Sequence, residues 1–226
     1  MTMDTAAERD EGPSQGVLAG PGTITAIAGL TFAISDERGD IGPGPFGLIS
    51  DDTRHLSLLQ VSVDSEPLRH LGSGLMSPAV ARFRSYATLR DRLPDAPVEC
   101  ERLRRVSAAG MVETLTLRCW TLEPVRLRLS IRMGSDFADI FEVRRLAGDP
   151  GVPSPGVAVQ RSPGDLSFEA AGTPRSTSVS LEPVPDLVSG GDAEWDVVLH
   201  RDRPWVLRVG VQASRGAGNE DRATLP

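Results

Sequence analysis

The sequence has no lysine, because all 24 basic residues of the 226-residue chain are arginine. This absence excludes Schiff-base catalysis and a P-loop, each of which needs a lysine ammonium group. Cysteine is almost as scarce, and Cys100 and Cys119 have neither the spacing of a zinc motif nor the number needed for a disulfide framework. We therefore expect two buried, reduced thiols in a cytoplasmic protein.

Long apolar runs and excess positive charge are also missing. No stretch reaches the roughly 18 apolar residues of a membrane span, and the acidic N-terminus has no apolar segment of a signal peptide. A net charge of −7 argues against a nucleic acid or a membrane surface as partner. The histidines, His55, His70 and His200, lack the spacing of metal ligands, so we predict no metal site and no cofactor.

Turn-forming residues, in contrast, are abundant, with 23 glycines and 18 prolines. Between them lie short β-rich runs, and the clearest is Val125–Met133, where apolar and polar residues alternate strictly. We expect Met111–Trp120 to be its neighbouring strand. About a dozen such runs predict an all-β fold, a large antiparallel β-sandwich of supersandwich type. We divide the chain into a polar tail (1–22), the sandwich domain (23–213) and a C-terminal tail or severed linker (214–226).

One charged motif interrupts an apolar segment, Gly47–Ser57. Apolar flanks pull this segment toward a core, whereas Asp51, Asp52 and Arg54 are excluded from a core unless they are paired. We expect the charges at the core's margin, with Arg54 available as a bidentate partner for a carboxylate. The simplest interpretation is a polar turn between strands with a structural Asp–Arg pair. On a strand, the two adjacent aspartates would point to opposite faces and would not form a catalytic pair.

A second charged motif is Ser135–Arg145, in which Asp136, Asp139 and Glu142 are spaced i, i+3, i+6. On one helical turn this spacing would bring two carboxyl groups together, as glycoside hydrolysis requires. A loop fixed by ion pairs to Arg144 or Arg145 is the interpretation that we favour.

Other conspicuous side chains have ordinary explanations. Arg102, Arg104 and Arg105 are expected on a solvated sheet face rather than in an anion site. The tryptophans can stack on sugar rings, but at strand ends they more often pack in the core or at its rim; they are Trp120, Trp195 and Trp205.

Four blocks, taken in order, resemble one family. They are LTFAISDERGDI (30–41), FGLISDDTRHLSLLQVSVDSEPL (46–68), MVETLTLRCWTLEPVRLRLSI (111–131) and DFADIFEVRR (136–145). This combination is similar to the N-terminal domain of bacterial glycogen-debranching (amylo-α-1,6-glucosidase) family proteins. The resemblance covers residues 23–145 well and the remainder loosely.

The resemblance implies a β-sandwich packed on a C-terminal (α/α)6 barrel, in cis or on a separate chain, which holds the catalytic carboxylates. We therefore expect this chain to end before the barrel, to have no catalytic residue of its own, and to have an α-glucan as a candidate ligand. The positions that match the family, which we expect to lie together and face the barrel, are Asp51, Asp52, Thr53, Arg54, Asp136, Phe137, Asp139, Phe141, Glu142 and Arg144.

Two alternatives remain open from the sequence. The first is a stand-alone carbohydrate-binding module with an exposed aromatic platform. The second is a self-sufficient glycosidase that uses Asp51 or Asp52 with Asp136 or Asp139.

Overall fold

The computed structural model describes residues 22–89, 98–146, 157–172 and 174–214, except for the side chains of residues 144–146 and 157–161. The described part consists of strands in three antiparallel sheets and one short helix, α1 (Ile140–Leu146). This confirms the predicted all-β class, with seventeen strands among the described residues where about a dozen were expected. No described helix has the length and apolar character needed to cross a membrane.

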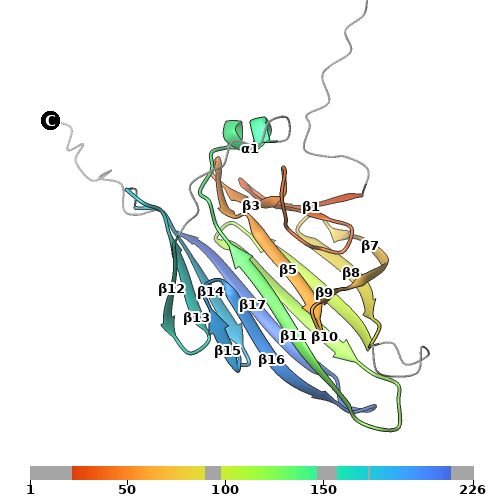
Figure 1. The fold of residues 1–226 in the computed structure, drawn as a ribbon. Coiled ribbons are helices and arrows are strands. Elements are labelled where there is room, and N and C mark those ends of the chain that lie inside the picture. Colours follow the sequence, from red (N-terminus) through yellow and green to blue (C-terminus); the bar gives the residue numbers. More distant parts are fainter. Residues whose placement is uncertain (1–21, 90–97, 147–156, 173, 215–226) are drawn as a thin grey trace, which may run out of the picture.

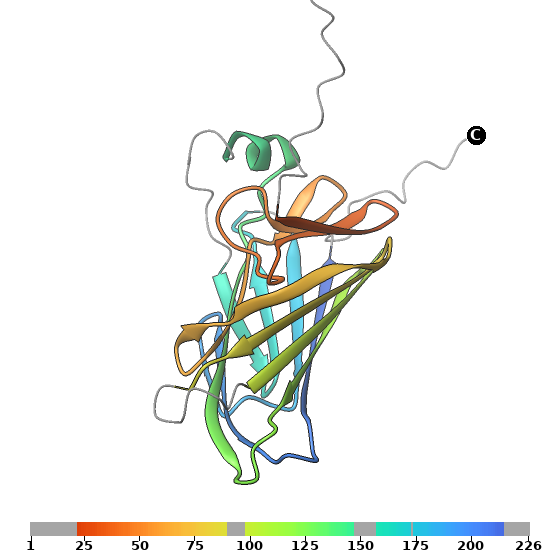
Figure 2. The same ribbon diagram turned by 90° about the vertical axis from the view of Figure 1, so that its right-hand side faces the viewer.

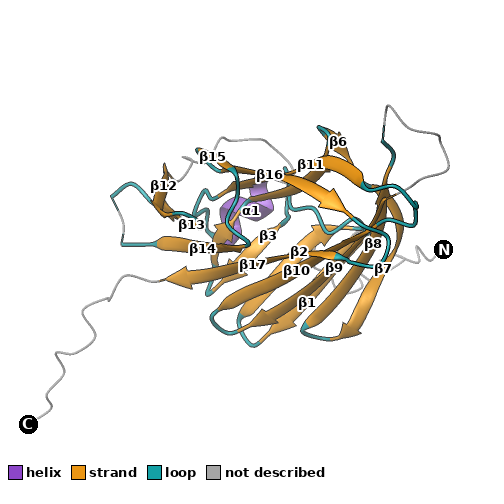
Figure 3. Cartoon of the chain, turned by 90° about the horizontal axis from the view of Figure 1, so that it is seen from below, coloured by secondary structure: helices purple, strands orange, loops and turns teal. Residues whose placement is uncertain are grey.

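Two sheets face each other as layers (Figure 3). The larger has, in spatial order, β12 (Val157–Ser162), β13 (Asp165–Glu169), β14 (Ser176–Glu182), β17 (Trp205–Ser214), β10 (Gly110–Arg118), β9 (Val98–Ser107), β8 (Val80–Ala87) and β7 (Arg69–Ser77). The smaller has, in spatial order, β15 (Leu187–Ser189), β16 (Asp192–Leu199), β11 (Val125–Gly134), β5 (Leu58–Val63) and β6 (Glu66–Pro67).

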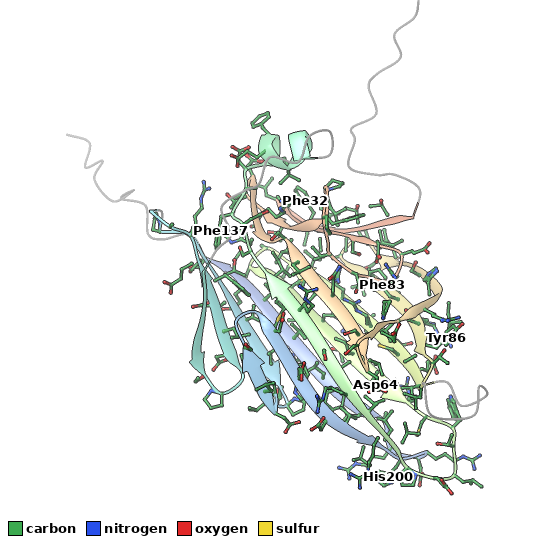
Figure 4. The ribbon with its side chains drawn as sticks, viewed as in Figure 1. Phe32, Asp64, Phe83, Tyr86, Phe137 and His200 are labelled. Carbon is green, nitrogen blue, oxygen red and sulfur yellow. The ribbon has the colours of Figure 1, made fainter. Side chains whose placement is uncertain are left out.

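The third sheet and α1 lie at one end of the sandwich, opposite the β10–β11 connection (Figures 1 and 2). Its four strands, in order, are β1 (Thr23–Ala28), β2 (Thr31–Asp36), β3 (Gly47–Ser50) and β4 (Thr53–Leu56). In Figure 4, Phe32 and Phe137 lie at this end, whereas His200 lies at the other.

The main core fills the space between the two large sheets. Leu129 and Ile131 of β11 and Leu115 and Leu117 of β10 are at most 1% exposed and belong to one buried cluster. Alternation of apolar and polar residues produces this arrangement, because successive side chains of a strand point to opposite faces. A smaller cluster attaches α1 to the third sheet, and it contains Ile34, Ile49, Ala138, Ile140 and Val143.

The predicted pairing of Met111–Trp120 with Val125–Met133 is wrong. β10 pairs with β9 and β17, whereas β11 pairs with β16 and β5 in the other sheet. The chain therefore crosses from one layer to the other between these strands. The predicted tails at 1–22 and 214–226 lie almost wholly outside the described residues, so the domain boundaries stay predictions.

Candidate functional site

The two aspartates of the first motif occupy a hairpin turn rather than a strand. Ser50 pairs with Thr53 across Asp51 and Asp52, which have φ values of +48° and +63°. Positive φ at both central residues is typical of the two-residue turn that matches the twist of a hairpin, and aspartate tolerates this conformation better than most residues. The predicted polar turn is therefore confirmed, and the strand alternative, with the two side chains on opposite faces, does not apply. The turn leaves Asp52 exposed and Asp51 half-buried.

Arg54 joins the first motif to the second. Its Nε donates to Oδ1 of Asp136 at 3.0 Å, and its Nη2 pairs with Oδ2 of the same carboxylate. Nη1 donates to the carbonyl oxygen of Gly44 at 2.8 Å. The Arg54 and Asp136 side chains are 5% and 10% exposed, so the pair is largely removed from water. The predicted pairing of Arg54 with a carboxylate is confirmed, and the partner belongs to the second motif.

Gly47 lets this arginine approach the backbone of β3. A Cβ at Gly47 would lie 2.6 Å from Cδ of Arg54 and 2.9 Å from the carbonyl oxygen of Leu56. Real Cβ contacts are essentially never that short, so any other residue here would force the Arg54 side chain or the facing backbone to shift.

Backbone hydrogen bonds attach the second motif to the free side of β4. The amide of Arg54 donates to the carbonyl of Ala138 at 2.8 Å, and the amide of Ile140 donates to the carbonyl of Asp52 at 2.9 Å. Thr53 and Asp139 form an antiparallel bridge between these bonds. The two motifs are thus one structural unit, with Thr53 buried inside it.

Asp139 and Glu142 form a capping box at the start of α1. Oδ1 of Asp139 accepts the amides of Phe141 and Glu142, each at 2.8 Å, and Oε2 of Glu142 accepts the amide of Asp139 at 2.8 Å. Asp136 lies before the helix, which begins at Ile140, so the alternative of a helical turn that pairs catalytic carboxylates does not extend to Asp136. The side chains of Arg144 and Arg145, predicted as their partners, lie outside the described residues.

His55 is a buried residue of this unit for which the sequence offered no role. Its ring contacts Phe137 edge-on at 5.8 Å, and Phe137 is 7% exposed with a φ of +51°. The hydroxyl of Thr177 donates to the carbonyl oxygen of His55 at 2.8 Å, so the ring Nδ1 donates to that hydroxyl oxygen at 3.2 Å. Burial lowers the pKa of His55, which favours the neutral ring over the charged one.

A second charged cluster corrects the expectation that the arginines of β9 lie on a solvated sheet face. Arg102 and Arg104 are each 1% exposed, whereas Arg105 is exposed as predicted. Each of the buried pair donates to a different oxygen of Glu113, and Arg102 also pairs with Asp40. Burial would raise the pKa of Glu113, but the two guanidinium groups outweigh it and lower that pKa.

These arrangements contain no recognisable catalytic pair. Asp136 is held by Arg54 and Asp139 by the helix cap, so both carboxylates already have structural partners. Within the described ranges no group of three histidine, cysteine or acidic side chains is placed to hold a metal ion. Trp195 is 2% exposed and packs edge-on against Trp205, while Trp120 is 62% exposed.

Comparison with known proteins assigns this chain to a family. Residues 27–210 match the family described as the N-terminal domain of some glycogen debranching enzymes. No curated protein matches the chain.

Two solved structures resemble the chain at low identity. A protein from the human microbiome described as a kojibiose phosphorylase has a TM-score of 0.48 and 7% identity, over 72% of this chain and 22% of its own. A protein from Escherichia coli K12 described as an aldose 1-epimerase has a TM-score of 0.49 and 10% identity, over 85% of this chain and 99% of its own. The chain therefore spans about a fifth of the first of these, and at such scores neither likeness carries a functional argument.

Proposed function

Because this chain belongs to the family of N-terminal domains of some glycogen debranching enzymes, we propose that it is a non-catalytic β-sandwich domain that docks on a C-terminal (α/α)6 catalytic barrel. The barrel is in cis or on a separate chain, and it hydrolyses the branches of an α-glucan. The sandwich stabilises the barrel and forms one wall of its substrate cleft.

The proposal places the contact on a docking surface made of Leu30, Asp52, Phe141 and Glu142. Leu30 is 73% exposed and Phe141 is 65% exposed. They lie near the turn of the first motif, because the amide of Asp51 donates to the carbonyl of Leu30 at 3.3 Å and the amide of Ile140 donates to that of Asp52. Large apolar side chains exposed beside charged ones suit a surface that a partner covers.

The buried ion pair beneath this surface is the observation that carries the proposal. Arg54 and Asp136 fix α1 and the Asp51-Asp52 turn to each other, so the exposed leucine and phenylalanine are held in place before any partner arrives. A pre-organised surface loses little conformational freedom on association.

The two alternatives have less support. An aromatic platform needs neighbouring exposed rings, but Trp120 follows β10 at one end of the molecule and Phe141 lies on α1 at the other (Figure 1). A self-sufficient glycosidase needs free carboxylates, whereas Asp136 and Asp139 are engaged in the ion pair and the helix cap.

The test measures binding between this chain and the glucosidase barrel of the same organism, expressed separately. Leu30→Ser combined with Phe141→Ser is expected to weaken binding at least tenfold, because two exposed apolar anchors are lost. Leu122→Ser, which changes a leucine that is 86% exposed at the opposite end, is the matched control and should bind like wild type. Unchanged binding of the Leu30/Phe141 variant would contradict the proposal.

A further inference from the structure

A cavity of about 990 Å³ lies beside the β1–β2 hairpin, away from the docking surface. The turn after β2 forms one wall with Asp36, Glu37 and Arg38, and β6 with the start of β7 forms the other. In β1–β2, Thr23 pairs with Asp36 at the cavity end, whereas Ala28 pairs with Thr31 at the end that carries Leu30. A strand of this length separates the two surfaces by roughly 17 Å, so both can be occupied at once.

The cavity wall offers hydrogen-bond donors and acceptors in similar number. Its ionisable side chains are three carboxylates, two guanidinium groups and one imidazole, contributed by Asp36, Glu37, Glu66, Arg38, Arg69 and His70. Arg38 pairs with Asp36 at 3.0 Å, and Nδ1 of His70 lies 3.6 Å from Oε1 of Glu37. A charged ligand of either sign would meet a like charge here, whereas a neutral ligand rich in hydroxyl groups would find partners for both its donors and its acceptors.

The turn that carries the wall residues Asp36, Glu37 and Arg38 is fixed from behind by the buried arginines. Oδ1 of Asp36 accepts the amides of Arg38 and Asp40 at 2.9 Å and 2.8 Å, which closes the turn. The carbonyl oxygen of Gly39 accepts from Nη2 of Arg102 at 2.9 Å and from Nη2 of Arg104 at 2.6 Å.

Gly39 is essential to that attachment. It has a φ of +85°, and a Cβ there would lie 2.9 Å from the ring of Phe83, which Figure 4 labels on β8. Because a buried charge network seldom stabilises a fold more than apolar packing would, its clearest effect here is to hold this turn in one conformation.

We propose that the cavity binds a neutral oligosaccharide, a segment of the glucan on which the family's enzymes act. The hydroxyl-rich class of ligand follows from the cavity, and the choice of an α-glucan rests on the proposed function. Glu37 accepts hydrogen bonds from sugar hydroxyls, and Arg38 and His70 donate to them. Half-buried Phe46 supplies the apolar part of the wall. The site retains the polymer beside the barrel without taking part in hydrolysis.

The test titrates this chain, without any barrel, with maltoheptaose while amide chemical shifts are recorded. Saturable shifts confined to residues 36–38 and 69–70 are expected. The double variant Glu37→Ala/His70→Ala should weaken binding about tenfold, since one charge-assisted hydrogen bond is worth at least that much. Asp192→Ala is the matched control. Asp192 is 55% exposed and lies 3.7 Å from Arg132, and Glu37 is 54% exposed and lies at a similar distance from His70.

Three outcomes would overturn the site: no saturable shift, shifts that the double variant leaves unchanged, or saturable binding of inorganic phosphate in place of the sugar. Thermal unfolding of each variant like that of wild type establishes that the fold is intact. The titration contains no barrel, so the absence of sugar binding would not contradict the docking proposal. In the same way, the absence of docking would not contradict sugar binding at this cavity.

Discussion

Arg54 binds both carboxylate oxygens of Asp136, which lies 82 residues further along the chain. This one contact joins a hairpin turn of the third sheet to the segment that leads into α1. Arg54 is buried and Asp136 is largely buried, so either one left alone would be a poorly compensated charge.

Arg54→Met should therefore lower the free energy of unfolding by about 3–5 kcal/mol, and Asp136→Leu by a similar amount. The double variant should be much less destabilised than the sum of the two, because it leaves no unpaired charge. Urea unfolding of the four proteins in a double-mutant cycle measures this coupling. Additive effects of the two substitutions would mean that the pair does not interact as described.

Substitutions of Asp52 can distinguish effects on stability from effects on docking. The residue has a φ of +63°, which affects stability, and an exposed side chain, which is available to a partner. Asp52→Gly should not lower the free energy of unfolding, since glycine adopts positive φ without strain. Asp52→Val should lower it by about 1–2 kcal/mol. Both variants should bind the barrel more weakly than wild type. Equal stability of the two variants would contradict the turn geometry.

His55 predicts a pH dependence of stability. Its pKa is lowered by burial from an ordinary value near 6.5, so the folded state favours the neutral ring. The contribution of the neutral His55 ring to the free energy of unfolding is complete above pH 6.5, and it is lost as the pH falls below that value. Between pH 7.5 and pH 5.5, wild type should therefore lose more unfolding free energy than His55→Gln. Identical losses would show that His55 titrates normally in the folded protein.

The cysteines should be inert in the folded protein. Burial raises the pKa of the Cys100 thiol to about 12, and Cys119 is 1% exposed. Because the thiolate is the reactive form, a thiol reagent at pH 8 should modify neither residue until the chain unfolds. Rapid reaction of native Cys119→Ala, which retains Cys100, would contradict this burial.

The alternation of apolar and polar residues along the chain was enough to predict the fold class, but it did not predict which strands pair. β10 and β11 both alternate and follow each other closely, which is equally consistent with a hairpin and with a crossing between layers. The burial of Arg102 and Arg104 did have a local signal: they are in phase with Val98, Cys100 and Val106, which are buried on the same face of β9. Their partners Glu113 and Asp40 come from elsewhere in the chain. Without those partners in view, the two charged side chains were expected on the solvated face of the strand.

In the candidate site, the sequence predicted a carboxylate partner for Arg54, because a charged side chain between apolar flanks needs a partner. A polar turn with a structural Asp–Arg pair was also predicted, but the positive φ of Asp51 and Asp52 was not, since neither position holds the glycine that usually marks it. The family resemblance, now confirmed over residues 27–210, added the connection between two motifs that physics alone treated separately.

Hydrogen–deuterium exchange of this chain with and without the barrel tests the docking proposal most directly. We predict added protection in residues 29–31, 51–53 and 139–143, and none in the connection between β10 and β11 at the opposite end. Protection confined to that opposite end, or to the outer strands β7 and β12, would contradict the account.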